Sequence, residues 1–122
     1  MDHNSKINNS PKDCIFCKII AHQIPATIVK ENDEVIVIKD LYPQAPVHFL
    51  IIPKKHISDI GAFTKDDKAL AGSLLLMAQE LSTHDAQAHQ FRLISNNGPQ
   101  SGQTIFHTHI HFLAGRSFKE VL

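Results

Sequence analysis

Short runs of apolar, often β-branched residues alternate with polar segments along the chain, and they predict five β-strands. Runs of this kind, bounded by Asn, Asp, Pro or Gly, are typical of strands. They lie at residues 27–31, 34–39, 47–52, 91–95 and 105–113. Asn32 and Asp33 stand between the first two runs and tolerate tight-turn geometry, so these two strands are expected to form an antiparallel hairpin.

A short helix is expected over residues 14–22. Asp13 stands where its carboxylate can accept hydrogen bonds from the free N–H groups of the first turn. Pro25 ends the helical segment, because proline disfavours helical geometry in the residue before it.

A longer helix is expected over residues 64–82. Thr64 and Asp67 have nearly the spacing of a capping box, which satisfies N–H groups at the start of a helix. The apolar residues form two adjacent stripes, one of Leu70, Leu74, Met77 and Leu81 and one of Ala71, Leu75 and Ala78. Two stripes exceed the surface that packs against one sheet. The helix therefore either lies deep in its own domain or also contacts a second subunit.

These elements predict an α+β fold with a five-stranded antiparallel sheet, one short helix and one long helix, since crossovers are too few for repeated βαβ units. The chain has 122 residues, of which 43% are hydrophobic, and this suits one domain. Residues 1–12 are polar and rich in Asn and Ser, so we expect a disordered leader there and a domain over residues 13–122.

Charge and hydropathy limit the partners. The 12 basic residues are balanced by 12 acidic residues, which gives no electrostatic reason to expect a nucleic acid or an anionic membrane as a partner. The leader lacks the apolar segment of a signal peptide, and no apolar run reaches membrane-spanning length. We therefore expect a cytoplasmic protein.

The densest chemistry lies in the last apolar run, where His107, His109 and His111 occur at every second position. Side chains alternate faces along a strand, so the three imidazoles are expected on one face, about 7 Å apart. Histidine titrates closest to neutral pH, and such a row can supply a nucleophile, a proton donor and a hydrogen-bonding cation. The same residues can instead ligate a catalytic zinc. The spacing alone leaves both uses open.

A polar segment, residues 95–104, leads directly into the histidine run. It contains Gly98 and Gly102, which let a backbone approach a ligand closely. Its N–H groups and the side chains of Gln103 and Thr104 can surround phosphate oxygens.

The two cysteines, Cys14 and Cys17, have the Cys-x-x-Cys spacing. A thioredoxin-type redox pair would follow a strand of a βαβ unit, whereas here a polar segment precedes the pair. Two thiolates at this spacing supply half of a tetrahedral zinc site, and a histidine-rich chain has candidates for the rest. Small hydrophobic side chains on a buried helix are the alternative.

Together these motifs resemble the histidine-triad (HIT) superfamily. Residues 107–113 are similar to its signature of three histidines separated by apolar residues, although Thr108 stands where a bulky apolar residue is more usual. Residues 40–57 are similar to the central segment of the Hint branch, including its Pro-Gln-Ala-Pro and Pro-Lys-Lys-His stretches. The resemblance covers about residues 13–116. It implies a HIT-like fold, a homodimer and the hydrolysis of purine nucleoside 5′-phosphoramidates.

The resemblance also implies catalytic roles for matching positions. His109 would attack the α-phosphorus and form a nucleotidyl-imidazole, which water then hydrolyses. His111 and His48 would hydrogen-bond the phosphoryl oxygens, and Thr104 would help the leaving amine gain its proton. No metal would be needed for this displacement.

Further matching positions would bind the nucleotide or a metal. Asp40 would accept from the ribose hydroxyls, Asn96 would touch the phosphate or ribose, and Gly102 and Gln103 would complete the phosphate cradle. The apolar residues of the base slot would be Ile15, Phe16, Ile19, Ile38 and Leu41. The ligands of a structural zinc would be Cys14, Cys17, His56 and His107.

Three other functions compete with the phosphoramidase. One is a dinucleoside polyphosphate hydrolase of the fragile-histidine branch, against which the Pro-Gln-Ala-Pro and Lys-Lys-His stretches count. Another is a purine-nucleotide-binding module without catalysis. The third is a zinc hydrolase that uses His107, His109 and His111 as ligands.

Overall fold

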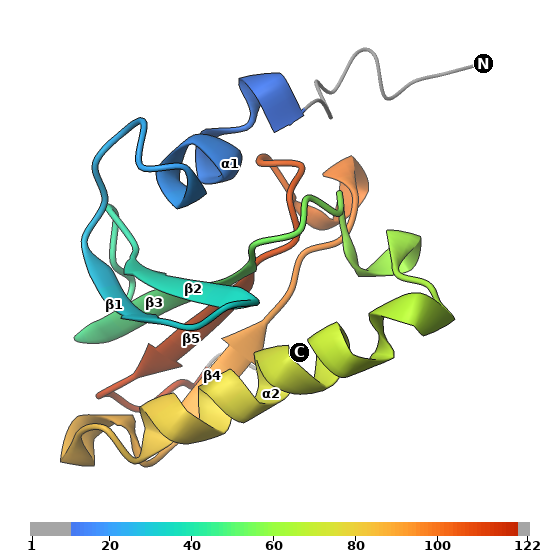
Figure 1. Ribbon diagram of the computed structural model, residues 1–122. Helices are drawn as coiled ribbons and strands as arrows, with labels where there is room; N and C mark the ends of the chain where they lie inside the picture. Colours follow the sequence, from blue (N-terminus) through green and yellow to red (C-terminus); the bar gives the residue numbers. More distant parts are fainter. Residues whose placement is uncertain (1–10, 120–122) are drawn as a thin grey trace.

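The computed structural model describes residues 11–119 and contains a five-stranded antiparallel sheet with the strand order β1-β2-β3-β5-β4. The strands are β1 (Ile28–Glu31), β2 (Val35–Lys39), β3 (Val47–Pro53), β4 (Phe91–Ile94) and β5 (Ile110–Ala114). The long helix α2 (Lys68–Ser82) lies below the sheet in Figure 1, and the short helix α1 (Ile15–Ile20) lies above it. The expected α+β fold is confirmed.

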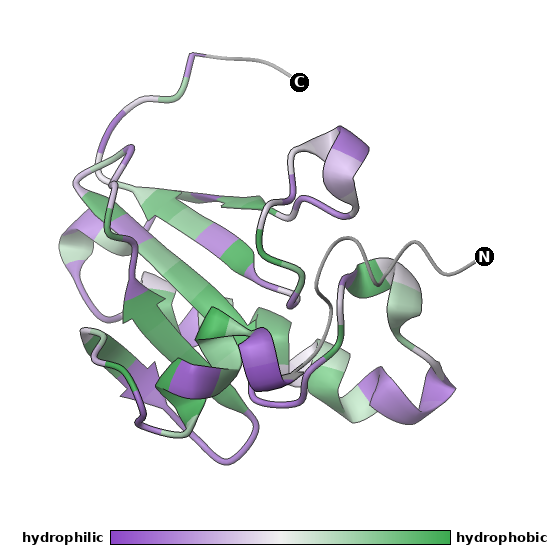
Figure 2. Ribbon diagram, turned by 90° about the horizontal axis from the view of Figure 1, so that it is seen from above, coloured by the Kyte–Doolittle hydropathy of each residue, from purple (hydrophilic) through white to green (hydrophobic). Residues whose placement is uncertain are grey.

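Both faces of the sheet are covered, so its central strands are apolar on both sides. Val35 and Val37 of β2 pack in the cluster that includes α2, and Ile36 and Ile38 pack in the cluster that includes α1. This explains why β2 is a continuous apolar run rather than an alternating one. Figure 2 shows hydrophobic residues concentrated in the sheet and hydrophilic residues in the connecting loops.

The capping box expected at Thr64 is present, but it caps a 3-10 turn, and α2 begins at Lys68 rather than at residue 64. The Thr64 hydroxyl accepts from Asp66 N at 3.2 Å, and the Asp67 carboxylate accepts from Thr64 N at 2.9 Å. A 3-10 turn, Lys65–Asp67, precedes the helix, and Lys55 donates to the Asp67 carboxylate at 2.7 Å. Further 3-10 turns lie at Pro11–Asp13, Ile60–Ala62, Ala86–Ala88 and Pro99–Ser101.

The two apolar stripes of α2 have different environments. Leu70, Leu74, Met77 and Leu81 are buried in the core, as expected for the first stripe. Of the second stripe, Ala78 joins the same core, whereas Leu75 is 60% exposed. The neighbouring Leu76 is 63% exposed. A helix face with two exposed leucines is therefore left beside the core-facing one.

The short helix α1 differs from the prediction at both ends. Its N-cap is Cys14 and not Asp13, since the Cys14 sulfur accepts from Cys17 N at 3.4 Å. The helix ends at Ile20, well before Pro25, because His22 takes a left-handed conformation with φ of 60°. Of the expected leader, residues 1–10 lie outside the described residues, and Pro11 and Lys12 begin a 3-10 turn.

Strand β5 begins at Ile110, so the prediction of a strand from residue 105 is wrong. Ile51 of β3 pairs with Ile110, and the same register would set Thr108 opposite Pro53. Pro53 has no N–H and cannot continue the ladder. Thr108 instead donates from both N and Oγ1 to the carbonyl of Ile57, at 2.7 and 2.8 Å. Only His111 of the three histidines therefore lies in a strand.

None of the helices within residues 11–119 has the length and apolar character needed to cross a bilayer.

Candidate active site and metal centre

Four residues from three segments bring their ligand atoms together. Cys14 and Cys17 lie at the start of α1, His56 follows β3, and His107 precedes β5. Their ligand atoms all lie within 4.8 Å of one another. Cys14 Sγ is 3.3 Å from His107 Nδ1, Cys17 Sγ is 3.3 Å from His56 Nδ1, and the two Nδ1 atoms are 3.2 Å apart. Zinc bonds of about 2.0–2.3 Å in a tetrahedron would set such atoms about 3.3–3.8 Å apart, so this cluster can bind a metal ion.

The ring of His107 is held in the orientation that a ligand needs. Its Nε2 donates to the carbonyl of Pro53 at 2.7 Å, so Nδ1 carries a lone pair toward the cysteines. Burial lowers the pKa of His107 to about 4, which keeps the ring neutral. Burial and the neighbouring Cys14 raise the pKa of the Cys17 thiol to about 12. A bound cation removes the proton from a thiol that coordinates it.

His109 has one ring nitrogen without a hydrogen-bond partner among residues 11–119. Its Nδ1 donates to the carbonyl of His107 at 2.8 Å, which leaves the proton off Nε2 in the neutral ring. The ring packs edge-on against Phe16 and His111, with centroid distances of 5.1 and 5.3 Å. Burial also lowers the pKa of His109. A neutral imidazole with a fixed tautomer is suited to act as a nucleophile.

His48 and His111 form a hydrogen-bonded pair beside it. Gln44 N donates to His48 Nδ1 at 3.0 Å, so the proton of neutral His48 lies on Nε2. His48 Nε2 is 2.9 Å from His111 Nδ1, so His111 Nδ1 must accept this hydrogen bond. The proton of the neutral His111 ring therefore lies on its Nε2. Burial, with the neighbouring His109 and His48, lowers the pKa of His111 to about 4. Burial lowers the pKa of His48 as well, against the attraction of Asp40.

Asp40 lies against this pair. One carboxylate oxygen accepts from Tyr42 N at 2.8 Å, and the other is 3.5 Å from His48 Nε2 and 4.0 Å from His111 Nδ1. The ligand atoms of Asp40, His48 and His111 also lie within 4.8 Å of one another. A metal bound here, however, would need the lone pair of His48 Nε2. Because the N–H of Gln44 donates to His48 Nδ1, the proton of the neutral ring stays on Nε2. Among residues 11–119 the cysteine-containing cluster is therefore the better cation site, whereas in this trio the two histidines hydrogen-bond each other with the Asp40 carboxylate beside them.

The three histidines do not form a metal site of their own. Both ring nitrogens of His107 face groups other than His109 and His111, namely the cysteine-containing cluster and the Pro53 carbonyl. Within the part of the chain that the structure describes, the zinc hydrolase with a three-histidine centre is therefore not supported.

The Gln103 amide has a different environment from the one expected. The side chain is 4% exposed and uses both ends within the protein. Its oxygen accepts from Gly98 N at 2.7 Å, and its nitrogen donates to the carbonyls of Ser58 and Ile105 at 2.7 and 3.0 Å. A phosphate contact from this side chain would have to replace one of these bonds. Gln103 thus braces the approach loop, in which Gly102 adopts φ of 105°.

The remaining predicted binding residues are spread over surface and core. Thr104 is exposed and lines a small cavity of about 150 Å³ with Cys14 and Ile15. Asn96 is half-buried. Of the expected base slot, Phe16, Ile19 and Ile38 are buried in the α1 cluster, whereas Ile15 is 43% and Leu41 is 83% exposed.

Several groups that organise the site are backbone atoms, and the sequence motifs do not identify which ones. The N–H of Gln44 and the carbonyls of Pro53, Ile57 and His107 set the orientation of His48, His107, Thr108 and His109. Every residue type has a backbone carbonyl and every type except proline has an N–H, so no residue choice in the sequence marks these groups.

Known proteins are similar to this chain in sequence and in fold. A sequence model of the family described as "Scavenger mRNA decapping enzyme C-term binding" matches residues 13–120. An uncharacterized HIT-like protein of Synechocystis sp. is 51% identical over 107 residues, which are 88% of this chain and 94% of that protein. The structure of a HIT family hydrolase from Legionella pneumophila is 40% identical with a TM-score of 0.83, covering 86% of this chain and 95% of that one. A HIT family hydrolase from Clostridium thermocellum is 38% identical with a TM-score of 0.87, covering 91% and 97%.

Proposed function

Because this chain belongs to the HIT-like family, whose solved members include hydrolases, we propose that it hydrolyses purine nucleoside 5′-phosphoramidates through a nucleotide bound covalently to His109. One observation carries the proposal. The 2.8 Å hydrogen bond from His109 Nδ1 to the His107 carbonyl holds the ring proton on Nδ1, so the lone pair of the neutral ring is on Nε2.

The reaction would proceed in two displacements. His109 Nε2 attacks the α-phosphorus, the P–N bond breaks, and the amine leaves with a proton from the solvent that Thr104 would help to deliver. Water then attacks the same phosphorus, the bond to His109 breaks, and a nucleoside monophosphate is released. Splitting one difficult displacement into two easier ones is the general advantage of covalent catalysis.

The His48–His111 pair would serve the phosphoryl oxygens. With its Nδ1 accepting from His48, the neutral His111 ring has its N–H at Nε2 and can donate to an oxygen on which charge develops. Asp40 lies close enough to both rings to stabilise the pair when charge moves through it. The ribose contact expected for Asp40 would compete with these interactions.

We propose that the cysteine-containing cluster holds zinc and that this zinc is structural. Four protein ligands complete a tetrahedron and leave no position for a substrate. Bound zinc would link the segment of α1 to the segments that follow β3 and precede β5, and its binding energy would add to folding stability. The displacement at phosphorus needs no metal.

We further propose a homodimer formed through α2 and the edge strand β4. Leu75 and Leu76 on α2 are 60% and 63% exposed, and Phe91 on β4 is 40% exposed. Large apolar side chains of this kind are typical of the core of an interface. A cytoplasmic location and the absence of nucleic-acid and membrane partners stay predictions.

The proposed activity is tested with adenosine 5′-phosphoramidate as substrate, in parallel with diadenosine tetraphosphate and with AMP binding. We expect release of AMP and ammonia from the phosphoramidate and a much lower kcat/KM for the polyphosphate. Preferred cleavage of the polyphosphate would favour the fragile-histidine type of function. Binding of AMP without turnover of either compound would favour a nucleotide-binding module.

A further inference from the structure

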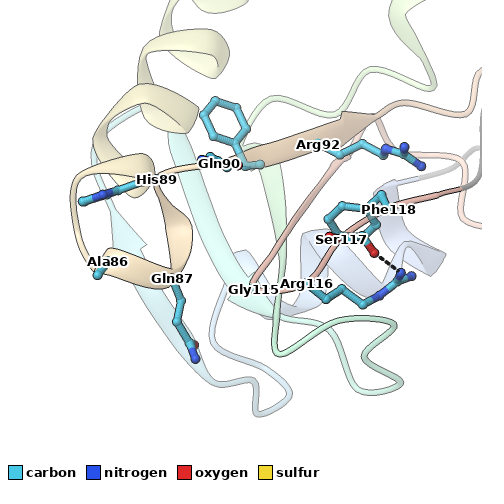
Figure 3. A pocket seen from close by; sticks show the side chains of 10 residues that line it. Ala86, Gln87, His89, Gln90, Arg92, Gly115, Arg116, Ser117 and Phe118 are labelled. Carbon is cyan, nitrogen blue, oxygen red and sulfur yellow. Dashed lines mark hydrogen bonds between the residues drawn. The ribbon is translucent and has the colours of Figure 1, made fainter.

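Arg116, directly after β5, reaches back to the loop that precedes β3. Its Nε donates to the carbonyl of Gln44 at 3.1 Å, and its Nη1 donates to the carbonyl of Ser117 at 2.8 Å. Figure 3 shows the bond to Ser117 and the Arg116 side chain beside Phe118. Arg116 is exposed and lies 72 residues from Gln44 in the sequence, so no local pattern connects the two.

Gly115 makes this approach possible. It has φ of 94°, a conformation that favours glycine, and a Cβ at this position would lie 2.9 Å from Cβ of Pro46. The end of β5 therefore lies directly against the segment that contains Gln44 and Pro46. The pairing of Val47 with Ala114 at the adjacent sheet position holds the two segments together.

Gln44 is held from its other side by a catalytic histidine. Its N–H donates to His48 Nδ1 at 3.0 Å, and His48 Nε2 is 2.9 Å from His111 Nδ1. Arg116, Gln44, His48 and His111 thus form a continuous series of contacts from the surface to the site. The Gln44 N–H is the group that determines which nitrogen of His48 carries the proton.

A stacked ring restrains Arg116. The Phe118 ring lies against two guanidinium groups, with its centroid 4.4 Å from Cζ of Arg116 and 4.9 Å from Cζ of Arg92 (Figure 3). These three side chains line a hollow of about 690 Å³. Contact between a guanidinium and an aromatic face is attractive and limits the rotamers of the long side chain. Arg92 shares the ring and the hollow with Arg116, which makes it a matched comparison.

We propose that Arg116 is a positioning residue for His48 and His111. By holding the Gln44 carbonyl, Arg116 keeps the Gln44 N–H hydrogen-bonded to His48 Nδ1. The proton of His48 therefore lies on its Nε2 and is donated to His111 Nδ1, so the proton of His111 lies on the Nε2 of that ring. The inference rests on the proposed function, since His111 Nε2–H is the group that would meet the phosphoryl oxygen. Loss of the Arg116 bond lets the loop shift and weakens transition-state stabilisation more than ground-state binding.

The test compares Arg116→Ala, Arg116→Lys and Arg92→Ala in the full chain. For Arg116→Ala we expect kcat to fall on the order of 10-fold to 100-fold with little change in KM, as for a small misplacement of a catalytic group. Arg116→Lys should recover part of kcat, because an ammonium can also donate to the Gln44 carbonyl. Arg92→Ala should keep the wild-type kcat. Equal losses in Arg92→Ala and Arg116→Ala, or a wild-type kcat in Arg116→Ala, would overturn the proposal.

A second measurement tests the same contacts in the absence of substrate. Nitrogen-15 NMR of His48 should show a single tautomer with unprotonated Nδ1 in the wild type and in Arg92→Ala. In Arg116→Ala we expect a mixture of tautomers and faster hydrogen exchange of the Gln44 amide. An unchanged His48 spectrum in Arg116→Ala would refute the positioning role. If the wild type hydrolyses no phosphoramidate, the proposed function fails, and the His48 spectrum still decides whether Arg116 positions this histidine.

Discussion

The carbonyl of His107 accepts the Nδ1 proton of His109 at 2.8 Å, while the ring of the same His107 lies in the cysteine-containing cluster with its Nδ1 3.3 Å from Cys14 Sγ. One residue therefore contributes its side chain to the candidate metal centre and its backbone to the orientation of the candidate nucleophile. The two sites therefore share one segment, residues 107–109.

Replacing the candidate nucleophile should separate catalysis from binding. In His109→Ala, turnover of adenosine 5′-phosphoramidate should fall by at least on the order of 10³-fold, because covalent chemistry is lost. AMP affinity should change only severalfold, since the remaining nucleotide contacts are kept. Steady-state kinetics and calorimetry measure the two effects, and His84→Ala, an exposed histidine beyond α2, is the control. In the wild type, a neutral or alkaline quench followed by intact mass should detect an added nucleoside monophosphate. Near-wild-type turnover in His109→Ala would show that another group attacks phosphorus.

Metal removal should destabilise the protein. Purified protein should contain about one zinc per chain by elemental analysis. A strong chelator should lower the Tm of the wild type, because the binding energy of a structural metal is folding energy. Cys14→Ala should have a lower Tm at the outset and should respond little to the chelator. A zinc centre would be contradicted if protein purified without chelators contains no metal and if the wild type has the same Tm with and without the chelator.

The buried hydroxyl of Thr108 should contribute little net stability. Thr108→Val keeps the shape of the side chain and the backbone bond to Ile57 O, and it removes only the 2.8 Å bond from Oγ1. We expect a loss of about 0.5–1.5 kcal/mol in the free energy of unfolding, the usual net worth of one hydrogen bond. Thr108→Ala should cost more because it also leaves a cavity. Urea denaturation of both variants measures the difference, and a valine variant less stable than the alanine variant would refute it.

The free energy of unfolding should fall as the pH is lowered, over a pH range determined by the pKa of His111. Its pKa is lowered from 6.5 to about 4 by burial and by the neighbouring His109 and His48, with Asp40 opposing the shift. Between these values the unfolded chain binds more protons than the folded one, so the free energy of unfolding falls as the pH falls from 6.5 toward 4. His111→Asn should show a shallower dependence in this window. Denaturation at several pH values checks this prediction. Parallel plots of unfolding free energy against pH for the wild type and the variant would exclude His111 as a source of the pH dependence.

Charge on the exposed face of α2 should weaken self-association. Leu75→Glu places a carboxylate at a position that we propose to be desolvated in the dimer, which is costly without a partner charge. Light scattering should report twice the chain mass for the wild type and a shift toward one chain mass for the variant. Gln23→Glu, at an exposed position after α1 and away from the α2 face, is the control for added charge. Ala78→Glu is unsuitable, because Ala78 is 2% exposed in its own core. A monomeric wild type at micromolar concentration would remove the dimer.

Local patterns in the sequence were sufficient for most of the secondary structure. The hairpin of β1 and β2, the capping box at Thr64 and the buried stripe from Leu70 to Leu81 depend on neighbours within a few residues. Turn residues, capping spacing and the 3.6-residue period act at this range, so they can be recognised without a fold.

The sequence by itself determined the α+β class, the run of histidines and the Cys-x-x-Cys pair. Tertiary structure decided where β5 begins, because Pro53 across the sheet withholds the N–H that a longer ladder needs. It also decided that Gln103 braces a loop, and that Gln44, fixed by Arg116, determines which nitrogen of His48 carries the proton. The bond of Gln103 to Ser58 and the bond of Arg116 to Gln44 span 45 and 72 residues of sequence, and the start of β5 depends on the register of a neighbouring strand. Every residue type has a backbone carbonyl and every type except proline has an N–H, so only the folded chain shows which of these groups meet.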